Sequence, residues 1–239
     1  MGSLSGRVAI FTGASSGIGA ATARILSQAG VRCVLTARRQ ARLDALAATL
    51  PHTATLAGDM LDPELPSRLI ALAHERFQAC DIVVNNAGVL VAAPIEELEI
   101  ERMCHMVRVN VEAAFRLAYT AVREFRRQGH GHLVNTSSVL GTKVRLTAGA
   151  YAGTKFAIEA LSEALRMELG GSRIKVSCIE PGLVMTELHR ELAVHPREQL
   201  CLRAALEPED VARGIRFLLE QPDHVLGARL MLLAADQAL

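Results

Sequence analysis

The sequence predicts a doubly wound α/β fold, in which helices cover both faces of one parallel sheet. Short apolar runs alternate along the chain with longer segments of helical periodicity, and these runs show little polar alternation. Such runs are typical of strands buried on both faces, and alternating strands and helices form parallel sheets. The 239 residues are half hydrophobic and contain no Pro-, Gly- or Ser-rich linker, so we expect one domain over residues 1–239.

The elements follow from these patterns in order along the chain. The predicted strands are residues 7–12, 31–36, 53–57, 81–84, 132–136, 175–179 and 228–233, of which 53–57 is the weakest. Helical periodicity occupies residues 18–29, 40–49, 63–79, 96–128, 151–169 and 208–220. In the last of these, Val211, Ile215 and Leu218 recur at helical spacing after an acidic first turn. Ligands of such sheets bind beyond the carboxyl ends of the strands, so the residues after each strand are the candidate site.

Composition disfavours several classes of partner. The net charge is +1, from 26 basic and 25 acidic residues, and only six Phe and two Tyr are available for base stacking, so nucleic-acid binding is not expected. No apolar stretch approaches the roughly 18 residues that span a bilayer, and the first residues lack the apolar run of a signal peptide. The five irregularly spaced cysteines are interpreted as reduced thiols of a cytoplasmic protein.

A glycine-rich loop follows the first predicted strand. Residues 12–19, Thr-Gly-Ala-Ser-Ser-Gly-Ile-Gly, lead directly into a predicted helix. Glycines there allow a tight turn, the close approach of a pyrophosphate and the packing of helix against strand, and the helix N-terminus offers free N–H groups. A glycine-rich turn without a ligand is the alternative. We predict dinucleotide binding by Gly13, Ser15, Ser16, Gly17, Ile18 and Gly19.

The end of the second strand indicates which dinucleotide is bound. Enzymes that use NAD usually carry an acidic residue about 20 positions after the loop, which bonds the ribose hydroxyls. Here Ala37 is followed by Arg38 and Arg39, with no carboxylate. A guanidinium grips a 2′-phosphate, which a carboxylate would repel. NADP(H) is therefore the predicted cofactor, with Arg38 a better candidate than Arg39, although both residues suit the solvated start of a helix.

Tyr151, Lys155 and Ser138 form the candidate catalytic group. Tyr151 and Lys155 are four residues apart, so they share one helix face, and Ser138 follows the fifth strand. The ordinary pKa of tyrosine, near 10, is too high for acid–base work at neutral pH, and a neighbouring ammonium is expected to lower it. With a serine hydroxyl holding a carbonyl oxygen, the group can deliver a proton while hydride reaches carbon. A Tyr-x-x-x-Lys pair alone is more often a surface feature.

With these motifs the sequence resembles the short-chain dehydrogenase/reductase family over essentially the whole chain. The family's phosphate loop matches residues 12–19, its Asn-Asn-Ala-Gly motif matches residues 85–88, and its Tyr-x-x-x-Lys pair matches Tyr151 and Lys155. Ser138 matches the catalytic serine, and Asn110 matches the active-site asparagine. The resemblance implies a single-domain Rossmann fold, with a seven-stranded parallel sheet in the order 3-2-1-4-5-6-7.

The resemblance also implies a role for each matched residue. Tyr151 would be the general acid/base, Ser138 would orient the carbonyl, and Lys155 would bind the nicotinamide ribose and lower the pKa of Tyr151. Asn110 would hold a water on the proton path, although it can equally relieve a helix bend, and Asn86 also suits a structural turn. Besides the loop, the arginines, Tyr151 and Lys155, the residues implied to bind the cofactor are Asp59, Met60, Asn86, Ala87, Gly88, Pro181, Gly182, Val184 and Thr186.

The substrate side is less defined. Residues 183–205 are expected to form a substrate loop that closes as a lid. Lys143 and Arg145 suit a substrate carboxylate, but also a solvated loop. His189, His195 and Cys201 are spaced six residues apart, which matches no common ligand pattern, so no metal is expected.

The leading hypothesis is an NADP-dependent oxidoreductase that acts on a small carbonyl or secondary alcohol. A 3-oxoacyl-carrier-protein reductase is the first alternative, with Arg123, Arg126 and Arg127 as a basic patch for an acidic carrier. A sensor that binds NADP without turnover is the second, and a sensor needs none of the catalytic residues. The helices near 101–128 and 151–169 carry apolar residues on more than one face, including Met103, Met106, Phe115, Phe156 and Leu165. The family resemblance implies that these helices pair in a homo-oligomer, either a dimer or a tetramer, although the same residues also suit the core.

Overall fold

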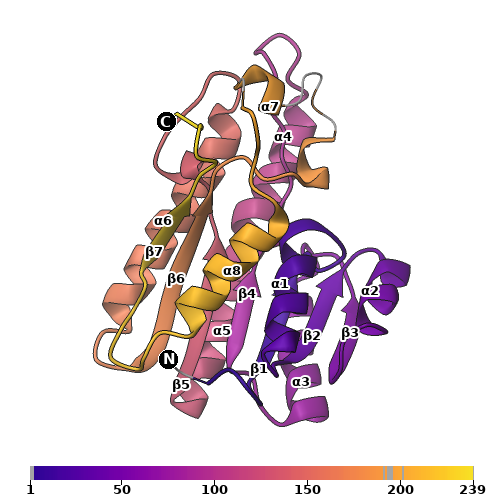
Figure 1. Ribbon diagram of the computed structural model, residues 1–239, viewed down its shortest axis with the longest axis vertical. Helices are drawn as coiled ribbons and strands as arrows, with labels where there is room; N and C mark the ends of the chain where they lie inside the picture. Colours follow the sequence, from indigo (N-terminus) through magenta and orange to yellow (C-terminus); the bar gives the residue numbers. More distant parts are fainter. Residues whose placement is uncertain (1–2, 191, 193–195, 201, 239) are drawn as a thin grey trace.

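A computed structural model describes residues 3–190, 192, 196–200 and 202–238. Its fold is built on one seven-stranded sheet, and Figure 1 shows how the helices are arranged around it. The strand order is β3-β2-β1-β4-β5-β6-β7, and every neighbouring pair is parallel. The strands are β1 (Val8–Thr12), β2 (Arg32–Ala37), β3 (Thr53–Ala57), β4 (Ile82–Asn85), β5 (His130–Thr136), β6 (Arg173–Pro181) and β7 (Arg229–Leu232). The predicted fold class and strand order are confirmed.

Helices cover both faces of this sheet. On one face lie α1 (Gly17–Gln28), α2 (Gln40–Ala47) and α8 (Pro208–Leu219), and on the other lie α3 (Leu65–Phe77), α5 (Ala114–Gln128) and α6 (Gly149–Glu168). Figure 1 shows α1 and α8 side by side across their face. Side chains alternate along each strand, so Ala9 and Phe11 of β1 enter the α1/α8 core while Val8 and Ile10 enter the α3/α5 core.

The single helix predicted over residues 96–128 is wrong in two respects. It begins at Ile100, with α4 (Ile100–Val107), and α4 is separated from α5 by the π-helical segment η1 (Arg108–Ala113). The apolar pattern passes through η1 without a break, so periodicity gave no sign of the insertion. Such π-helical segments occur frequently at functional sites, and η1 carries Asn110.

The strand order fixes where ligands can bind. β2 and β4 lie on opposite sides of β1 in the sheet. The connections that follow β1 and β4 therefore lead away from each other at the carboxyl edge of the sheet. A cleft of about 890 Å³ opens there, and residues that follow each of the seven strands line it. None of the helices in the described part of the chain is long and apolar enough to cross a membrane.

Candidate active site

A network of polar side chains fixes the loops at the base of the cleft. The Thr12 hydroxyl accepts hydrogen bonds from the backbone N–H groups of Asn86 and Ala87, each at 2.9 Å. The Asn86 amide returns a bond to the Thr12 carbonyl at 3.0 Å and accepts one from the Thr136 hydroxyl at 3.3 Å. Asn86 therefore joins the ends of β1, β4 and β5. This is the structural role that the sequence offered as an alternative to cofactor binding.

The glycines of the phosphate loop hold the backbone against the two walls of the cleft. Gly17 has a left-handed backbone, with φ of 52°, and a Cβ there would lie 3.1 Å from the Thr186 Cγ2. A Cβ on Gly13, also left-handed at 66°, would lie 3.0 Å from the Asn86 amide nitrogen. A Cβ on Gly19 would lie only 2.5 Å from the Gly13 carbonyl oxygen. The backbone thus forms a narrow cradle in front of the first turn of α1, whose N–H groups suit a pyrophosphate, so these residues fit a dinucleotide.

Both arginines after β2 line the cleft, but they differ in their contacts. Arg38 is exposed and makes no hydrogen bond or ion pair with the described residues. Arg39 donates to the Ser15 hydroxyl at 2.8 and 3.1 Å and to the Ser16 hydroxyl at 2.9 Å, so it lies over the phosphate loop. No carboxylate occupies the end of β2, and the edge beyond it is basic.

Ser138, Tyr151 and Lys155 meet at the buried end of the cleft. Ser138 precedes a single 3-10 turn, η2 (Val139–Gly141), and its hydroxyl accepts the Leu140 N–H at 3.1 Å, which fixes its orientation beside Tyr151. The Lys155 ammonium lies 5.7 Å from the centre of the Tyr151 ring and donates to the Thr136 carbonyl at 2.9 Å. All three side chains are buried, and the three residues line the same cleft as the phosphate loop.

Burial sets the proton affinities of this group. Desolvation raises the pKa of Tyr151 to about 12, and the hydrogen bond from Ser138 opposes it only in part. The lowered tyrosine pKa expected from Lys155 is therefore wrong for the protein alone. Desolvation likewise lowers the pKa of Lys155 to about 8, against the opposing influence of Cys178 and Glu159, so Lys155 loses its charge at a lower pH than an ordinary lysine.

Asn110 stands behind the cleft wall rather than in it. Its side-chain oxygen accepts the Val89 N–H at 2.9 Å, and its amide donates to the Val89 carbonyl at 2.8 Å and to the Thr154 hydroxyl at 3.3 Å. These bonds use both amide hydrogens, so the carboxamide can hold a water only through the second lone pair of its oxygen. The side chain of Asn110 holds the loop after β4 against α6.

The cleft brings together nearly all of the predicted site. Its lining includes every predicted catalytic and cofactor-binding residue except Gly19 and Asn110, which support it from behind. Lys143 and Arg145 also line the cleft, with exposed side chains, and His189 lies on its wall. Within the described residues no group of three His, Cys, Asp or Glu side chains is arranged for a metal ion, and His195 and Cys201 lie outside the described residues.

Two features of the cleft were missed in the sequence. Glu187, in the 3-10 turn η3 (Glu187–His189), pairs with arginines across the cleft mouth, whereas the sequence suggested for it only a solvated helix of the lid. Gln237, near the C-terminus, accepts the Leu183 N–H at 3.0 Å and packs on Gly182. The predicted lid segment, residues 183–205, contributes lining residues on both sides of the short helix α7 (Pro196–Gln199), and its closure stays a prediction.

A parallel sheet with a glycine cradle, a basic edge and a buried Ser–Tyr–Lys group defines a nicotinamide-dependent oxidoreductase of CH–OH and C=O groups. The sequence model of the short chain dehydrogenase family matches residues 7–196, and the chain belongs to this family.

Relatives and solved structures agree with this assignment. An uncharacterized oxidoreductase of Staphylococcus aureus strain USA300 is 33% identical over 224 residues, which cover 93% of this chain and 94% of that protein. An alcohol dehydrogenase from the archaeon Thermococcus sibiricus, complexed with 5-hydroxy-NADP, has a TM-score of 0.86 at 29% identity and covers 97% of this chain and 98% of its own. A 3-ketoacyl-(acyl-carrier-protein) reductase from Brucella melitensis, complexed with NADH, has a TM-score of 0.89 at 26% identity, covering 98% and 99%.

Proposed function

We propose that this protein is an NADP(H)-dependent oxidoreductase that interconverts a small carbonyl compound and its secondary alcohol, with Tyr151 as general acid/base. The observation that carries the proposal is the convergence of Ser138, Tyr151 and Lys155 at the buried end of a cleft whose other end is a phosphate cradle with a basic edge. The likeness to an alcohol dehydrogenase complexed with an NADP derivative supports the choice of cofactor and reaction.

The protein's own groups then account for proton transfer. When bound, NADPH supplies the hydride and NADP⁺ accepts it. The Ser138 hydroxyl holds the carbonyl oxygen beside the Tyr151 phenol, which donates its proton as negative charge develops on that oxygen. A tyrosine pKa of about 12 keeps the phenol protonated at neutral pH, which suits it to the reducing direction. Lys155, charged below its pKa of about 8, stabilises the phenolate that remains.

The first experiment is NADPH consumption by the purified protein with a panel of aldehydes, ketones, 3-oxoesters and 3-oxo acids, and with NADH in parallel. Turnover with NADPH well above that with NADH supports the proposal, and the best substrate begins to define the pocket. Equal rates with NADH would contradict the NADP preference. Arg38→Gln and Arg39→Gln, measured separately, then show which guanidinium recognises the 2′-phosphate.

Tyr151→Phe tests the mechanism and separates an enzyme from a sensor. Removal of a general acid costs about 10²- to 10⁴-fold in kcat, while the loss of one buried hydroxyl leaves NADPH binding nearly intact. Fluorescence titration of NADPH measures the binding, and NADPH oxidation measures the rate. Undiminished turnover in this variant would refute the proposed role of Tyr151, and tight NADPH binding without turnover in the wild type would favour the sensor.

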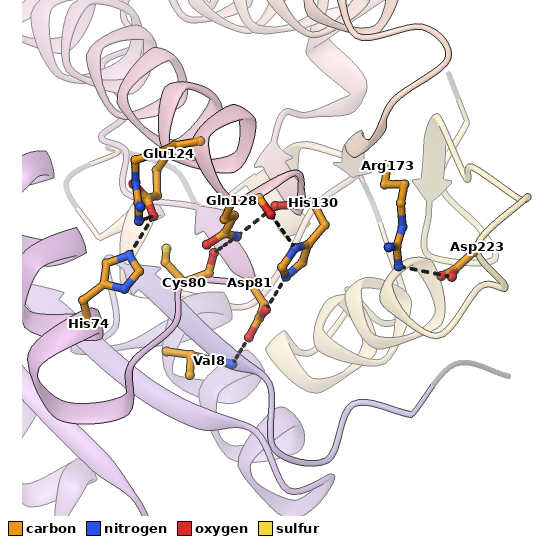
Figure 2. A network of polar contacts seen from close by, with 10 residues as sticks. Val8, His74, Cys80, Asp81, Glu124, Gln128, His130, Arg173 and Asp223 are labelled. Carbon is orange, nitrogen blue, oxygen red and sulfur yellow. Dashed lines mark hydrogen bonds and ion pairs between the residues drawn. The ribbon is translucent and has the colours of Figure 1, made fainter.

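A 3-oxoacyl-carrier-protein reductase is the second candidate, supported by the likeness to the Brucella enzyme. The position of the basic patch suggested for the carrier, Arg123, Arg126 and Arg127 on α5, argues against this candidate. Gln128, at the C-terminal end of α5, donates to the Cys80 carbonyl before β4 and to the His130 carbonyl at the start of β5, so that end of α5 lies at the amino edge of the sheet (Figure 2). That edge is about 20 Å from the cleft, one strand length away. Competition between a free and a carrier-bound 3-oxo substrate decides between the candidates.

We also propose that the chain forms a homo-oligomer through α5 and α6. Two of the five residues that suggested it, Met106 and Leu165, are fully buried in the core and are no part of such a face. Phe156 of α6 and Tyr119 of α5 are 43% and 42% exposed, so both remain available to such a face. Light scattering coupled to gel filtration measures the mass, and a monomer at all concentrations would refute the proposal.

A further inference from the structure

A group of ion pairs joins the two walls of the cleft mouth. The two carboxylate oxygens of Glu187 accept from the Arg39 guanidinium at 2.7 Å and from the Arg42 guanidinium at 2.8 Å. Arg190, three residues further on, contacts the same carboxylate at 2.7 Å. Glu187 belongs to the segment after β6, whereas Arg39 and Arg42 belong to the start of α2, 145 or more residues earlier in the chain.

Arg39 links this group to the phosphate loop. The same guanidinium that contacts Glu187 also donates to the hydroxyls of Ser15 and Ser16. Both serines, Arg39 and Glu187 line the cleft, at the edge where the strand after the loop ends without an acidic residue. A 2′-phosphate held there would need the donors of Arg39 that now point at a carboxylate.

The Glu187 carboxylate and a 2′-phosphate compete for the Arg39 guanidinium, because both are negatively charged. The hydrogen bonds from Arg39 and Arg42 lower the pKa of Glu187 to about 2, so the carboxylate is ionised throughout the neutral range. A phosphate dianion at the same guanidinium would face this negative charge at close distance, which costs affinity unless the carboxylate moves away. An adenosine ribose with free hydroxyls carries no such charge and meets no comparable repulsion.

We propose that Glu187 determines cofactor selectivity: its carboxylate occupies Arg39 and Arg42 until a 2′-phosphate displaces it, so it weakens the binding of NADP(H) and leaves that of NAD(H) unaffected. This inference rests on the proposed use of NADP(H). Glu187 thus limits the preference for NADP(H) over NAD(H) that the arginines create. Binding of a 2′-phosphate must first break the ion pairs of Glu187, which lowers the affinity for NADP(H).

The test is the affinity of Glu187→Gln for NADP⁺ and NAD⁺, measured by isothermal titration calorimetry without substrate. Glutamine keeps the size of the side chain and removes its charge. We expect NADP⁺ to bind about five- to twentyfold more tightly, since two partly exposed ion pairs no longer compete, and NAD⁺ to change less than about twofold. The fragments 2′,5′-ADP and 5′-AMP, which differ by the 2′-phosphate, are expected to reproduce the same contrast.

Two controls separate this effect from general electrostatics. Glu75→Gln removes an exposed carboxylate of α3 that is not part of the cleft lining, and it is expected to change neither affinity. In an Arg39→Gln background the Glu187→Gln substitution is expected to lose part of its effect on NADP⁺, because the Arg39–Glu187 pair no longer exists while the Arg42–Glu187 pair remains. Thermal unfolding of each variant verifies that it is folded.

Several results would overturn the inference. These are an NADP⁺ affinity that stays unchanged or falls in Glu187→Gln, an equal gain for NAD⁺, or a gain that persists in full without Arg39. If the wild type binds NAD⁺ in preference to NADP⁺, the proposed cofactor fails as well. If the wild type prefers NADP⁺ and only the Glu187 contrast is missing, the proposed function stands and this inference alone falls.

Discussion

Arg229→Met is expected to destabilise the protein by leaving two carboxylates without their counter-charge. Arg229 in β7 donates to the Glu180 carboxylate at 2.5 Å and lies 3.4 Å from that of Glu159 in α6. The side chains of Glu180 and Glu159 are 2% and 12% exposed, whereas that of Arg229 is 45% exposed. Methionine retains most of the apolar stem and removes the only cation paired with either carboxylate among the described residues.

The geometry sets the size of the effect. Breaking a buried ion pair by removing one partner costs about 3–5 kcal/mol, because the other charge stays buried and unpaired. Arg229 is nearly half exposed, so water can enter the space that it leaves, and we expect a lower cost of about 2–3 kcal/mol. For a chain of this size that corresponds to a fall in Tm of roughly 4–12 °C.

The pH dependence gives the assay its sharpest readout. Burial and the neighbouring Glu180 carboxylate raise the pKa of Glu159, and Arg229 opposes this rise, so its removal raises the pKa of Glu159 further. Such a group destabilises the folded state above its folded pKa, and the penalty fades as the pH falls and the carboxyl binds a proton. Urea unfolding, followed by circular dichroism from pH 5 to pH 8, should show the largest difference from wild type at pH 8 and a smaller one at pH 5.

A matched control is Arg68→Met, which breaks the exposed Arg68–Asp62 pair and should cost less than about 1 kcal/mol. If Arg229→Met costs no more than this control, or if its cost does not depend on pH, the burial argument for these two carboxylates is refuted.

Three further predictions concern single groups. Burial lowers the pKa of Lys155 to about 8, so kcat/KM for carbonyl reduction should fall above about pH 8. The residual activity of Lys155→Arg should lack this fall, because arginine stays charged. A pH profile of Lys155→Arg that matches the wild type would exclude Lys155 as the source of the fall. In Gly19→Ala the new Cβ would lie 2.5 Å from the Gly13 carbonyl oxygen, so the loop must shift and NADPH affinity, measured by fluorescence, should fall at least about tenfold; wild-type affinity would refute the cradle. The hydrogen bond from Arg127 lowers the pKa of Glu124, so this carboxylate stabilises the fold above its unfolded pKa and less as the pH falls. Glu124→Gln should therefore cost about 1–2 kcal/mol in urea unfolding at pH 7 and progressively less below pH 4, and a constant cost would contradict this reasoning.

Gly19→Ala and Glu124→Gln change opposite ends of the molecule. Glu124 belongs to the amino edge of the sheet, where it contacts His74 at 2.7 Å, while Asp81 contacts His130 at 3.0 Å and accepts the Val8 N–H (Figure 2). Stability effects there should leave cofactor affinity unchanged, since the cleft lies at the carboxyl edge. Changes in the phosphate loop should show the reverse pattern.

Local patterns were sufficient for most of the fold and for the members of the site. All seven strands lie within three residues of their predicted bounds at each end, because consecutive apolar residues mark strands that are buried on both faces. The residues after those strands met in one cleft because parallel strands end at one edge. The π-helical insertion at Asn110 was missed because the apolar pattern continues through it.

The sequence by itself determined the order of strands and helices, the phosphate loop, the absence of an acid after β2, and the Ser138, Tyr151 and Lys155 group. These depend on residue type and spacing along the chain. Only the tertiary structure decided that burial raises the pKa of Tyr151, and that Glu187 reaches Arg39 from 148 residues away. Desolvation depends on everything packed around a group, and an ion pair depends on where two distant segments meet in space. Neither quantity is encoded in local spacing.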